Sequence, residues 1–506
     1  MQKSSIAAIK RHRTAKLARL ATRSYYLHRK GRDAEMSALL CTTFLGMGGV
    51  YVKFMQGIML QSEIMQKWRS VDRLKVFENV DSEPLDILDI LRNELPREKL
   101  AQITLIQPQP FAAGSFGQVY YGQHQDGTAI IIKVLRPMIR ELLKYDLKLL
   151  TAFAKAFFLR MHQTNVTLDF DTAIKEFKTA TMRETDYVEE ARFATELYEH
   201  YKGHPKLIIP RTYLELCTNH IIVQEYIGGI SGAQILKMQE QGVEPRVYVK
   251  EQVNSDLDEQ LVTLGFESLV GIFNMERIAG DPHAGNVRFL TDNQVGLIDF
   301  GISAHTPPDR AAFFGIIVEW SRLFSDNQSI VGLFESFMRF FVSDLYRALR
   351  KLSNFMRSPE KTANFTQEVS EIAQHAFAKV TGENDIAGLI HDGRIIAIIN
   401  RIVNKGNRFG LVIKLEASEI LRASQTYINL VDGLGRRTAV LPRVFAEVVK
   451  QVDQDHPELR YQTEEGMSIS DALEIVSSWL GRVAERDPQL FQEITSRIRL
   501  NQQSDI

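Results

Sequence analysis

The chain has 506 residues, of which 44% are hydrophobic and 24% charged, so it is long enough to form several domains with sizeable cores. Its formal net charge of -1 provides no overall attraction to nucleic acid, and we expect no nucleic-acid partner. Its two cysteines, Cys41 and Cys217, lie far apart and lack metal-ligand spacing, which is typical of a protein from a reducing compartment.

Residues 1–40 form a basic arm, in which no acidic residue precedes Asp33. A helix through this arm would carry an apolar stripe, made by Ile6, Ile9, Leu17 and Leu20. Three interpretations stay open: a solvated basic helix, a surface that meets anionic lipid, and an organelle presequence, since presequences are also rich in arginine and free of acidic residues.

The uncharged segment "MSALLCTTFLGMGGVYV", residues 36–52, is short for a membrane span and rich in glycine and threonine. We therefore expect a buried helix or hairpin there. Residues 41–105 are predicted to form a helical extension. Within it, "SEPLDILDILRNEL" has the pattern of an amphipathic helix with Ser82 at its N-cap.

A strand-rich segment begins near residue 105, where short apolar runs alternate with turn signals. The Asp-Gly pair at 126–127 predicts a hairpin turn and places "TAIIIKVL" on the next strand. Residues 137–204 are expected to be helical, and "KLIIP" and "HIIVQEYIGG" are expected to be strands. The glycine pair at 228–229 would then act as a hinge between two lobes.

Further helices, a strand pair in "NVRFLTDNQVGLIDFG" and a long helical region complete the chain. This order predicts an α+β, two-lobed protein-kinase-like fold with an N-terminal helical extension and a long helical C-terminal region. The predicted parts are the basic arm 1–40, the helical extension 41–105, a strand-rich N-lobe with a helical insertion 106–229, a C-lobe 230–345 and a helical C-terminal region 346–506.

Phosphoryl transfer needs metal-bridged phosphates, a cation on the phosphate oxygens and a positioned carboxylate. Lys133 lies on the strand after the hairpin turn and would point beneath the small-residue loop "AAGSFGQV". Asp281 and Asn286 in "GDPHAGN" are five positions apart, as in a kinase catalytic loop, and Asp299 begins a "DFG" triplet after an apolar strand. This combination, in this order, predicts a Mg-ATP site.

A kinase also needs a glutamate on a helix to pair with the lysine. "MRETDYVEEARF" contains four acidic residues, of which Asp186 and Glu190 share a helix face because they are four apart. The competing interpretation is a solvated acidic helix.

These motifs resemble the UbiB/AarF-type (ABC1) atypical kinases, a family tied to ubiquinone and lipid metabolism. "AAGSFGQV" is similar to the alanine-rich loop of the family, "GDPHAGN" to its "ADPHPGN" segment and "VQEYIGG" to its hinge. "ETDYVEEA" is similar to the "ExDxxxEA" helix, and "KFMQ" to the "KxGQ" signature. The resemblance spans about residues 45–305.

The resemblance implies Lys133 as the phosphate-binding lysine, Glu190 as its partner, Asp281 as the catalytic aspartate, and Asn286 and Asp299 as metal ligands. It implies that the nucleotide is bound by residues of the loop, the lysine strand and the hinge, namely Ala112, Ala113, Gly114, Ser115, Phe116, Gly117, Val119, Lys133 and Glu225.

The same resemblance implies that Lys53 and Gln56, three apart on one helix face, belong to a helix that folds over the pocket. Glu184 and Asp186 would tie this regulatory helix down, and we expect an ion pair between Lys53 and Asp186. The sequence also permits Glu184 and Glu190 to exchange their roles.

The chain departs from the family pattern at two positions. Met55 replaces the signature glycine, so the covering helix would sit differently. Gly114 replaces an alanine of the loop, and glycine permits positive φ and a closer approach of backbone amides to phosphates. We therefore predict that this chain binds ATP more like an ordinary kinase than its relatives do.

We thus expect an Mg²⁺-dependent atypical kinase or ATPase that uses ATP or ADP and supports isoprenoid quinone biosynthesis or lipid homeostasis. Expected partners are an anionic membrane surface and quinone-biosynthesis enzymes, in the cytoplasm at the inner membrane face, or in the mitochondrion if the arm is a presequence. The alternative is a nucleotide-gated pseudokinase scaffold. A small-molecule phosphotransferase is disfavoured, because such enzymes need neither the alanine-rich loop nor "KFMQ".

Overall fold

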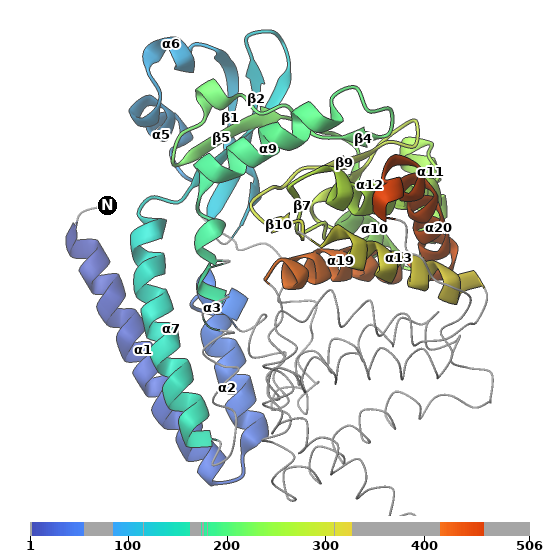
Figure 1. Ribbon diagram of the computed structural model, residues 1–506. Coiled ribbons are helices and arrows are strands. Elements are labelled where there is room, and N and C mark those ends of the chain that lie inside the picture. The colour runs from blue at the N-terminus through green and yellow to red at the C-terminus, as the bar shows by residue number, and fades with distance from the viewer. Residues whose placement is uncertain are drawn as a thin grey trace, which may run out of the picture. The chain divides into compact units, whose positions relative to one another are not determined.

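The computed structural model describes residues 3–54, 84–114, 116–161, 174, 177–179, 181–307, 309–325 and 415–459 (Figure 1). The chain divides into two compact units. The first comprises Met1–Gly203, Ile209–Gly228 and Ile298–Ile302, and the second comprises His204–Ile208, Gly229–Leu297 and Ser303–Ile506. The chain therefore passes from one unit to the other between the two glycines of the pair 228–229.

The first unit contains an antiparallel sheet in the order β1-β2-β3-β5. Its strands are β1 (Ile103–Ala113), β2 (Gly117–His124), β3 (Ala129–Leu135) and β5 (Ile221–Glu225). The predicted hairpin turn joins β2 to β3, and Gly127 adopts there a φ of 88°, a left-handed conformation that glycine reaches without strain. Val119 of β2 lies opposite Lys133 of β3 in the register.

The two faces of this sheet differ in burial, because successive side chains of a strand point to opposite faces. One face is fully buried against helix α5 (Ile87–Glu94) and a 3-10 turn, η3 (Leu214–Leu216). The other face carries Val119, Tyr121 and Ile131, which are only half-buried, together with Lys133. This second face is therefore able to receive a ligand.

Helix α5 begins later than expected. The Asp86 side chain accepts a hydrogen bond from the Asp89 N–H at 3.0 Å and so caps the helix, which starts at Ile87. The predicted cap, Ser82, lies outside the described residues, and residues 84–86 between it and the helix are not helical. The prediction of Ser82 as the N-cap was therefore wrong. The short helix α6 (Arg97–Leu100) leads from α5 toward β1.

The N-terminal part of the first unit is helical, with α1 (Lys3–Arg29), α2 (Asp33–Leu45), α3 (Val50–Phe54) and α7 (Ile139–Met161). Helices α1 and α7 lie side by side (Figure 1). Leu17 and Leu20 of the predicted apolar stripe are 3% exposed and belong to the core cluster of these helices. Lys10 also forms an ion pair with Glu141 of α7, at 2.7 Å. The basic arm is thus packed on the unit by its apolar stripe.

The uncharged segment 36–52 forms most of α2, a turn and the beginning of α3. Gly48 and Gly49 in the turn have φ values of 67° and 54°, which allow the chain to reverse between the helices. Met36, Leu40 and Phe44 are completely buried, as expected for a buried helical hairpin. Throughout the described ranges, no helix is long and apolar enough to cross a membrane.

The second unit contains a four-stranded sheet in the order β4-β9-β8-β6 and a two-stranded pair of β7 and β10. The strands are β4 (Leu207–Ile208), β6 (Ile230–Ser231), β7 (Arg277–Ala279), β8 (Val287–Phe289), β9 (Val295–Leu297) and β10 (Ser303–His305). The pair β8–β9 is the strand pair predicted in "NVRFLTDNQVGLIDFG".

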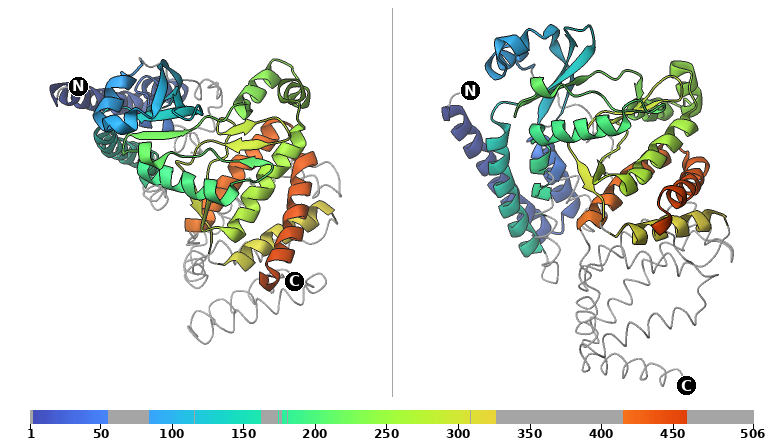
Figure 2. Two further views of the ribbon diagram at one scale, coloured as in Figure 1. Left: turned by 90° about the horizontal axis from the view of Figure 1, so that it is seen from above. Right: turned by 45° about the horizontal axis from the view of Figure 1, so that its top comes forward.

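The helices of the second unit pack around these strands. Two of them, α10 (Gly232–Glu240) and α11 (Pro245–Val253), follow β6 in the chain. The others form a helical layer (Figure 2), namely α12 (Leu257–Asn274), α13 (Arg310–Ser325), α19 (Leu415–Gly433) and α20 (Arg437–Asp455), which a short turn, η5 (Pro457–Leu459), follows.

Candidate active site

The small-residue loop leaves β1 at Ala113 and enters β2 at Gly117. The Gly114 N–H donates to the Gly117 carbonyl at 3.0 Å, which joins the two ends of the loop; Ser115 lies outside the described residues. Ala112 and Gly114 are exposed. The Arg136 N–H donates to the Phe116 carbonyl at 2.9 Å. The Arg136 guanidinium also donates to the Gly114 carbonyl at 3.3 Å, so the loop is held at both ends while Ala112 and Gly114 stay exposed.

The two glycines of this loop differ in their surroundings. A Cβ at Gly117 would lie 2.6 Å from the Val134 carbonyl oxygen and 2.8 Å from the Tyr187 hydroxyl, so this position requires glycine. A Cβ at Gly114 would meet, among the described residues, no atom nearer than the Gly117 oxygen at 4.0 Å. Gly114 is not among the glycines with positive φ, so the prediction that position 114 uses this freedom of glycine was wrong. Its lack of a side chain still lets a ligand come closer.

Lys133 lies at the centre of a charged cluster in the first unit. Its Nζ is 2.8 Å from Glu190 Oε1 and 3.4 Å from Asp299 Oδ2, and it donates to the Ile298 carbonyl at 3.4 Å. The side chains of Lys133 and Glu190 are 10% and 5% exposed, whereas that of Asp299 is 44% exposed. Glu190, rather than Glu184, is thus the glutamate that pairs with the lysine.

The charges of this cluster keep the lysine protonated. Burial alone would lower the pKa of Lys133, but the carboxylates of Asp299 and Glu190 outweigh it and raise the pKa above its ordinary value. Burial raises the pKa of Glu190, and Lys133 and the Phe300 N–H oppose that rise. The site therefore presents a fixed cation beside a solvent-accessible carboxylate.

The "DFG" segment is anchored by its phenylalanine. Phe300 is 1% exposed and packs edge-on against Phe193 of helix α9 (Tyr187–Tyr201), with ring centroids 6.4 Å apart. The Gly301 N–H donates to Asp299 Oδ1 at 3.1 Å. A Cβ at Gly301 would lie 3.3 Å from Glu190 Oε2, so glycine allows the segment to pass close to Glu190. Asp299 is thus oriented by its neighbours on both sides.

Helix α9 starts where an aspartate caps it. The Asp186 carboxylate accepts a hydrogen bond from the Glu189 N–H at 3.4 Å, and Glu190 then falls on the buried face with Ala191, Phe193 and Ala194. The competing interpretation, a fully solvated acidic helix, is therefore wrong for Glu190.

Lys53 of α3 connects this region to the loop. We expected Lys53 to pair with Asp186; the ion pair present in the structure joins Lys53 to Glu184, while Asp186 caps α9. The Lys53 ammonium also lies 4.8 Å from the centre of the Phe116 ring, within the range of a cation–π interaction. Gln56 and Met55, the other predicted features of this motif, lie outside the described residues.

Two residues that the motifs did not single out contribute to the site. Tyr187, one turn before Glu190, is buried beside Gly117, and burial raises the pKa of its phenol. Asp146 of α7 accepts a hydrogen bond from the Tyr51 hydroxyl at 2.7 Å and pairs with Arg13 of α1. Since Tyr51 is two residues before Lys53, this network fixes α3. The sequence signal for Tyr187 was its helical spacing from Glu190, whereas Asp146 lies among other charged residues of α7 and had no sequence signal.

The hinge segment ends the lysine-bearing sheet. The Glu225 N–H donates to the Arg211 carbonyl at 2.8 Å, and the Tyr226 N–H donates to the Ala129 carbonyl at 2.8 Å. The Tyr226 ring packs edge-on against Phe111 and Tyr121, with centroids 5.8 and 5.4 Å away. Aromatic side chains therefore border the open sheet face at the predicted hinge.

The "GDPHAGN" segment follows β7 in the second unit and is folded by its own backbone. The His283 Nδ1 accepts from the Gly285 N–H at 2.9 Å, and the Asn286 N–H donates to the His283 carbonyl at 2.8 Å. Asn286 Nδ2 donates to the Asp281 carbonyl at 3.2 Å, which leaves the Asn286 amide oxygen as an acceptor or metal ligand. The Ala233 N–H of α10 holds the Ala284 carbonyl at 3.0 Å.

Comparison with known proteins gives one matching family model, several relatives and a solved structure. The family model of the ABC1 atypical kinase-like domain matches residues 76–331. The chain is 25% identical to "Protein ACTIVITY OF BC1 COMPLEX KINASE 3, chloroplastic" of Arabidopsis thaliana over 278 residues, which are 54% of this chain and 37% of that relative. It is 23% identical to "Probable protein kinase UbiB" of Aeromonas salmonicida over 440 residues, 83% of this chain and 70% of that one. The chain thus spans little more than a third of the plant relative.

Among solved structures, that of Rv3197 in complex with erythromycin from Mycobacterium tuberculosis aligns with 52% of this chain and 62% of its own. The TM-score is 0.40, at 22% sequence identity.

Proposed function

Because this chain belongs to the ABC1 atypical kinase-like domain family, we propose that it binds ATP with Mg²⁺ and acts as an atypical kinase or ATPase. The observation that carries the proposal is the buried Lys133 cation, held between Glu190 and Asp299 on the open face of the sheet. A phosphate-binding lysine, its glutamate and a metal-binding aspartate are the parts that kinases assemble for phosphoryl transfer.

In this proposal each residue has one role. Lys133 binds phosphate oxygens and Glu190 positions it, while Asp281 orients the acceptor hydroxyl or a water molecule. The loop 112–117 covers the phosphates with its backbone, as in kinases. The adenine lies against the half-buried side chains of Val119 and Ile131 and bonds the hinge backbone at Glu225.

Asp299 and Asn286 are the residues that would hold Mg²⁺, and their chemistry fits this ion. Asp299 is an accessible carboxylate and Asn286 keeps an amide oxygen, both of which are oxygen ligands. No group of three or more His, Cys, Asp or Glu side chains in the described part of the chain could hold a metal by itself. Mg²⁺ needs no such cage, since it binds through one or two carboxylates plus substrate phosphates, whose charge it neutralises.

The proposal is tested by equilibrium titration with ATP and ADP, with and without Mg²⁺, and by ATP turnover with and without anionic lipid. We expect Mg²⁺-dependent nucleotide binding and measurable turnover. Absence of nucleotide binding would overturn the proposal. Binding without turnover under every condition would instead support the nucleotide-gated pseudokinase scaffold.

The wider role is also part of the proposal. The relatives named UbiB and the motif resemblance support a function in isoprenoid quinone biosynthesis or lipid homeostasis, with enzymes of quinone biosynthesis as partners. We also propose a two-lobed arrangement, in which a helical extension covers the nucleotide site and a helical region forms the C-terminal part of the chain. Quinone levels in a deletion strain, with and without complementation by the wild-type chain, test this role.

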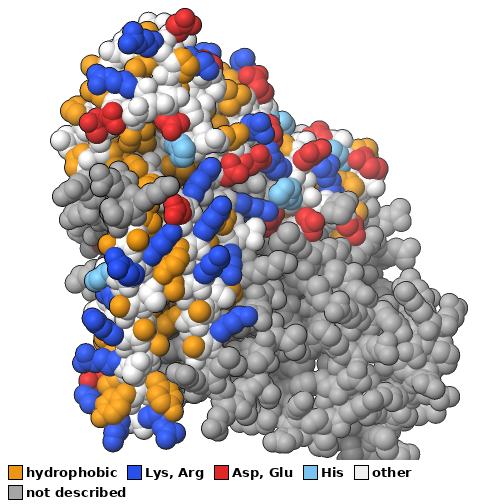
Figure 3. Space-filling view, turned by 90° about the vertical axis from the view of Figure 1, so that its left-hand side faces the viewer, with side chains coloured by type: hydrophobic (Ala, Val, Ile, Leu, Met, Phe, Trp, Pro, Cys, Tyr) orange, Lys and Arg blue, Asp and Glu red, His pale blue; other side chains and the backbone are white. Residues whose placement is uncertain are grey.

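We propose further that the exposed side of α1 binds anionic membranes (Figure 3). Arg11, Arg19 and Arg23 are exposed there, and Tyr26 is 56% exposed near the C-terminal end of the helix. Basic residues near an anionic surface each contribute about 1 kcal/mol, and tyrosine favours the membrane interface. In this proposal the arm meets anionic lipid with the exposed side of α1, while its apolar stripe packs on the unit.

Replacing Arg11, Arg19 and Arg23 together by glutamine is expected to weaken binding to anionic vesicles by about a hundredfold, since about 3 kcal/mol is lost. Cosedimentation with anionic vesicles over a salt series measures the effect, and neutral vesicles are the control. Deleting the arm is a poorer test, because Leu17 and Leu20 are part of the core. Binding that depends neither on salt nor on these arginines would contradict the prediction.

Gly114→Ala is expected to leave the fold intact, since the space at this position is open. It should weaken ATP binding by about tenfold relative to ADP, the effect of losing about one hydrogen bond to a charged group. Calorimetric titration of both proteins with both nucleotides measures this difference. Unchanged affinities and an unchanged nucleotide preference would contradict the role given to Gly114.

A further inference from the structure

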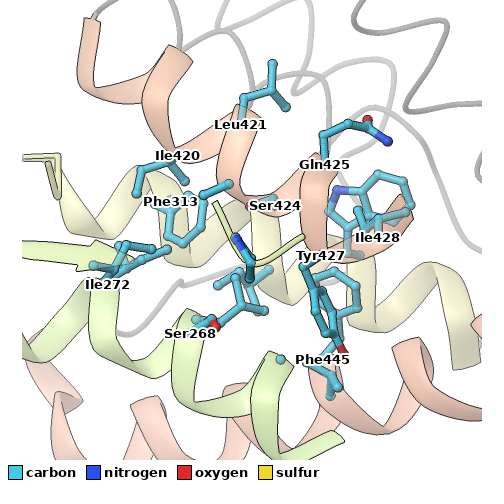
Figure 4. A pocket seen from close by; sticks show the side chains of 18 of the residues that line it. Ser268, Ile272, Phe313, Ile420, Leu421, Ser424, Gln425, Tyr427, Ile428 and Phe445 are labelled. Carbon is cyan, nitrogen blue, oxygen red and sulfur yellow. The ribbon is translucent and has the colours of Figure 1, made fainter. Parts of the chain in front are cut away.

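An apolar cavity of about 110 Å³, partly open to the surface, lies in the second unit among helices α12, α13, α19 and α20. Figure 4 shows Ile272, Phe313, Ile420, Tyr427 and Phe445 around it. Protein interiors are close-packed and keep few voids larger than a water molecule. A cavity of this size in a helical core is therefore a feature to explain.

The walls of this cavity are held by specific contacts. The Tyr427 hydroxyl donates to the Leu261 carbonyl at 2.8 Å, in the buried interior. The Tyr427 ring lies across Gly265, where a Cβ would come within 2.5 Å of the ring. Trp320 stacks on Phe445, with ring centroids 6.0 Å apart. The hydrogen bond of Tyr427 and the stacking of Trp320 on Phe445 thus maintain the shape of the cavity.

One polar side chain of the lining has no hydrogen-bond partner among the described residues. Ser268 Oγ donates to the Leu264 carbonyl at 2.7 Å, and the Gln425 amide donates to Asn429 at 2.8 Å. The Ser424 hydroxyl, on α19, makes no hydrogen bond with any residue that the structure describes. The lining contains no charged side chain. The cavity can therefore accept one hydrogen bond partner in an apolar surrounding, and it excludes ions, whose burial without a partner is costly.

We propose that this cavity binds an uncharged, mainly hydrocarbon ligand, the size of a six-membered ring or a branched five-carbon unit, whose single polar atom bonds Ser424. Cavities of about 150 Å³ lined by Leu, Ile and Phe stay dry and bind benzene, so the size and lining suit this class. A hydrocarbon group gains free energy in proportion to the apolar area that it buries there.

The site is placed to influence the catalytic loop. Ile278 and Ala279 of β7 and Pro282 also line the cavity, and Asp281 directly precedes Pro282. A ligand in the cavity therefore packs against the segment that carries Asp281. We infer that its occupancy changes ATP turnover; this second part rests on the proposed function, whereas binding itself does not.

Binding can be observed through Trp320, which lines the cavity. The chain has three tryptophans, and Trp68→Phe with Trp479→Phe leaves Trp320 as the only one. Titration of this full-length variant with bromobenzene, whose heavy atom quenches tryptophan on contact, should give saturable quenching. Quenching that rises linearly with bromobenzene, as random collisions give, or no quenching at all, would overturn the proposal. The same result is expected if another part of the chain fills the cavity.

Filling the cavity provides the matched comparison. Ala423→Leu on α19 should abolish saturable quenching and keep or raise the melting temperature, because filling a void stabilises. Arg422→Leu, on the exposed side of the same helix, should retain the quenching. Should Ala423→Leu fail to fold, Ser424→Leu serves as the second filling variant. Saturable quenching in a folded, filled variant would overturn the proposal.

Ser424→Ala separates the polar contact from the apolar fit. It should weaken displacement of bromobenzene by cyclohexanol about fivefold, through loss of one neutral hydrogen bond, and leave bromobenzene binding unchanged. An equal effect on both ligands would contradict the role of Ser424. Cyclohexanol should change ATP turnover in the wild type and not in the filled variant. If cyclohexanol binds and ATP turnover does not change, the proposed effect on turnover is wrong and the proposed binding site is retained. If the protein shows no ATP turnover at all, the quenching experiment still tests the binding site.

Discussion

Asp299→Asn is expected to lower Mg-ATP turnover by about 10²–10³-fold, the typical effect of removing one preorganised charge from an active site. Asparagine has the same shape and can still accept the Gly301 N–H, so the "DFG" segment keeps its conformation. The negative charge that would bind Mg²⁺ is lost. ATP affinity should therefore fall in the presence of Mg²⁺ and change little in its absence. Turnover assays and calorimetric titrations with and without Mg²⁺ measure these effects.

Stability is the control for this variant. The ion pair of Asp299 with Lys133 is 3.4 Å long and its carboxylate is 44% exposed, so solvent screening limits its contribution to about 1 kcal/mol or less. Lys133 also keeps Glu190. The melting temperature should thus stay close to that of the wild type. Asp292→Asn, in the exposed turn between β8 and β9, is the matched substitution and should change neither property. Turnover that survives in Asp299→Asn would remove Asp299 from the metal site.

The motifs predicted much of this architecture because they have local causes. The Asp-Gly pair at 126–127 determines a hairpin turn, and the turn places Lys133 on the strand beside the loop. The order of loop, lysine, "GDPHAGN" and "DFG" indicated the ABC1 family, which the family model confirms. Spacing in such motifs reflects fixed geometry of short turns and strands, so it can be read without a structure.

The division of roles among the acids depended on where one helix begins. "ETDYVEEA" allows several starting points, and each places a different glutamate on the inner face. In the structure Asp186 caps the helix, so Glu190 faces the core and Glu184 precedes the first turn, where it pairs with Lys53. Helix starts result from a competition between neighbouring caps. The same competition explains why Ser82 was predicted as a cap in place of Asp86.

Contacts between distant segments had no signal in the sequence. Phe116 looks like any loop residue, yet it is buried in the core of the N-terminal helices beneath Lys53. The apolar cavity is lined by residues between Gly265 and Phe445, most of which have the pattern of ordinary helical core positions. Whether such positions close-pack or leave a cavity depends on the tertiary fit of side-chain shapes, which hydrophobic patterns do not specify.

Glu190→Gln and Glu184→Gln are expected to have opposite consequences, although the two glutamates are only six positions apart. Glu190 is buried with Lys133, and Glu190→Gln removes the negative charge and leaves Lys133 a hydrogen bond to a neutral amide oxygen, which costs about 1–2 kcal/mol of unfolding free energy. Lys133 then keeps only Asp299 as its carboxylate neighbour in the described part of the unit and moves toward it. A displacement of about 1 Å can cost about 10²-fold in rate, so turnover should fall by that amount.

Glu184 pairs with Lys53 at the partly exposed start of α9, so Glu184→Gln should cost less than about 1 kcal/mol. If the helix that carries Lys53 covers the nucleotide site, loosening this pair should leave turnover unchanged or raise it. Thermal unfolding and ATP turnover of both variants, measured side by side, test the difference. Equal losses of turnover, or greater destabilisation by Glu184→Gln, would contradict it, because the buried pair at Lys133 would then not be the one that positions the phosphates.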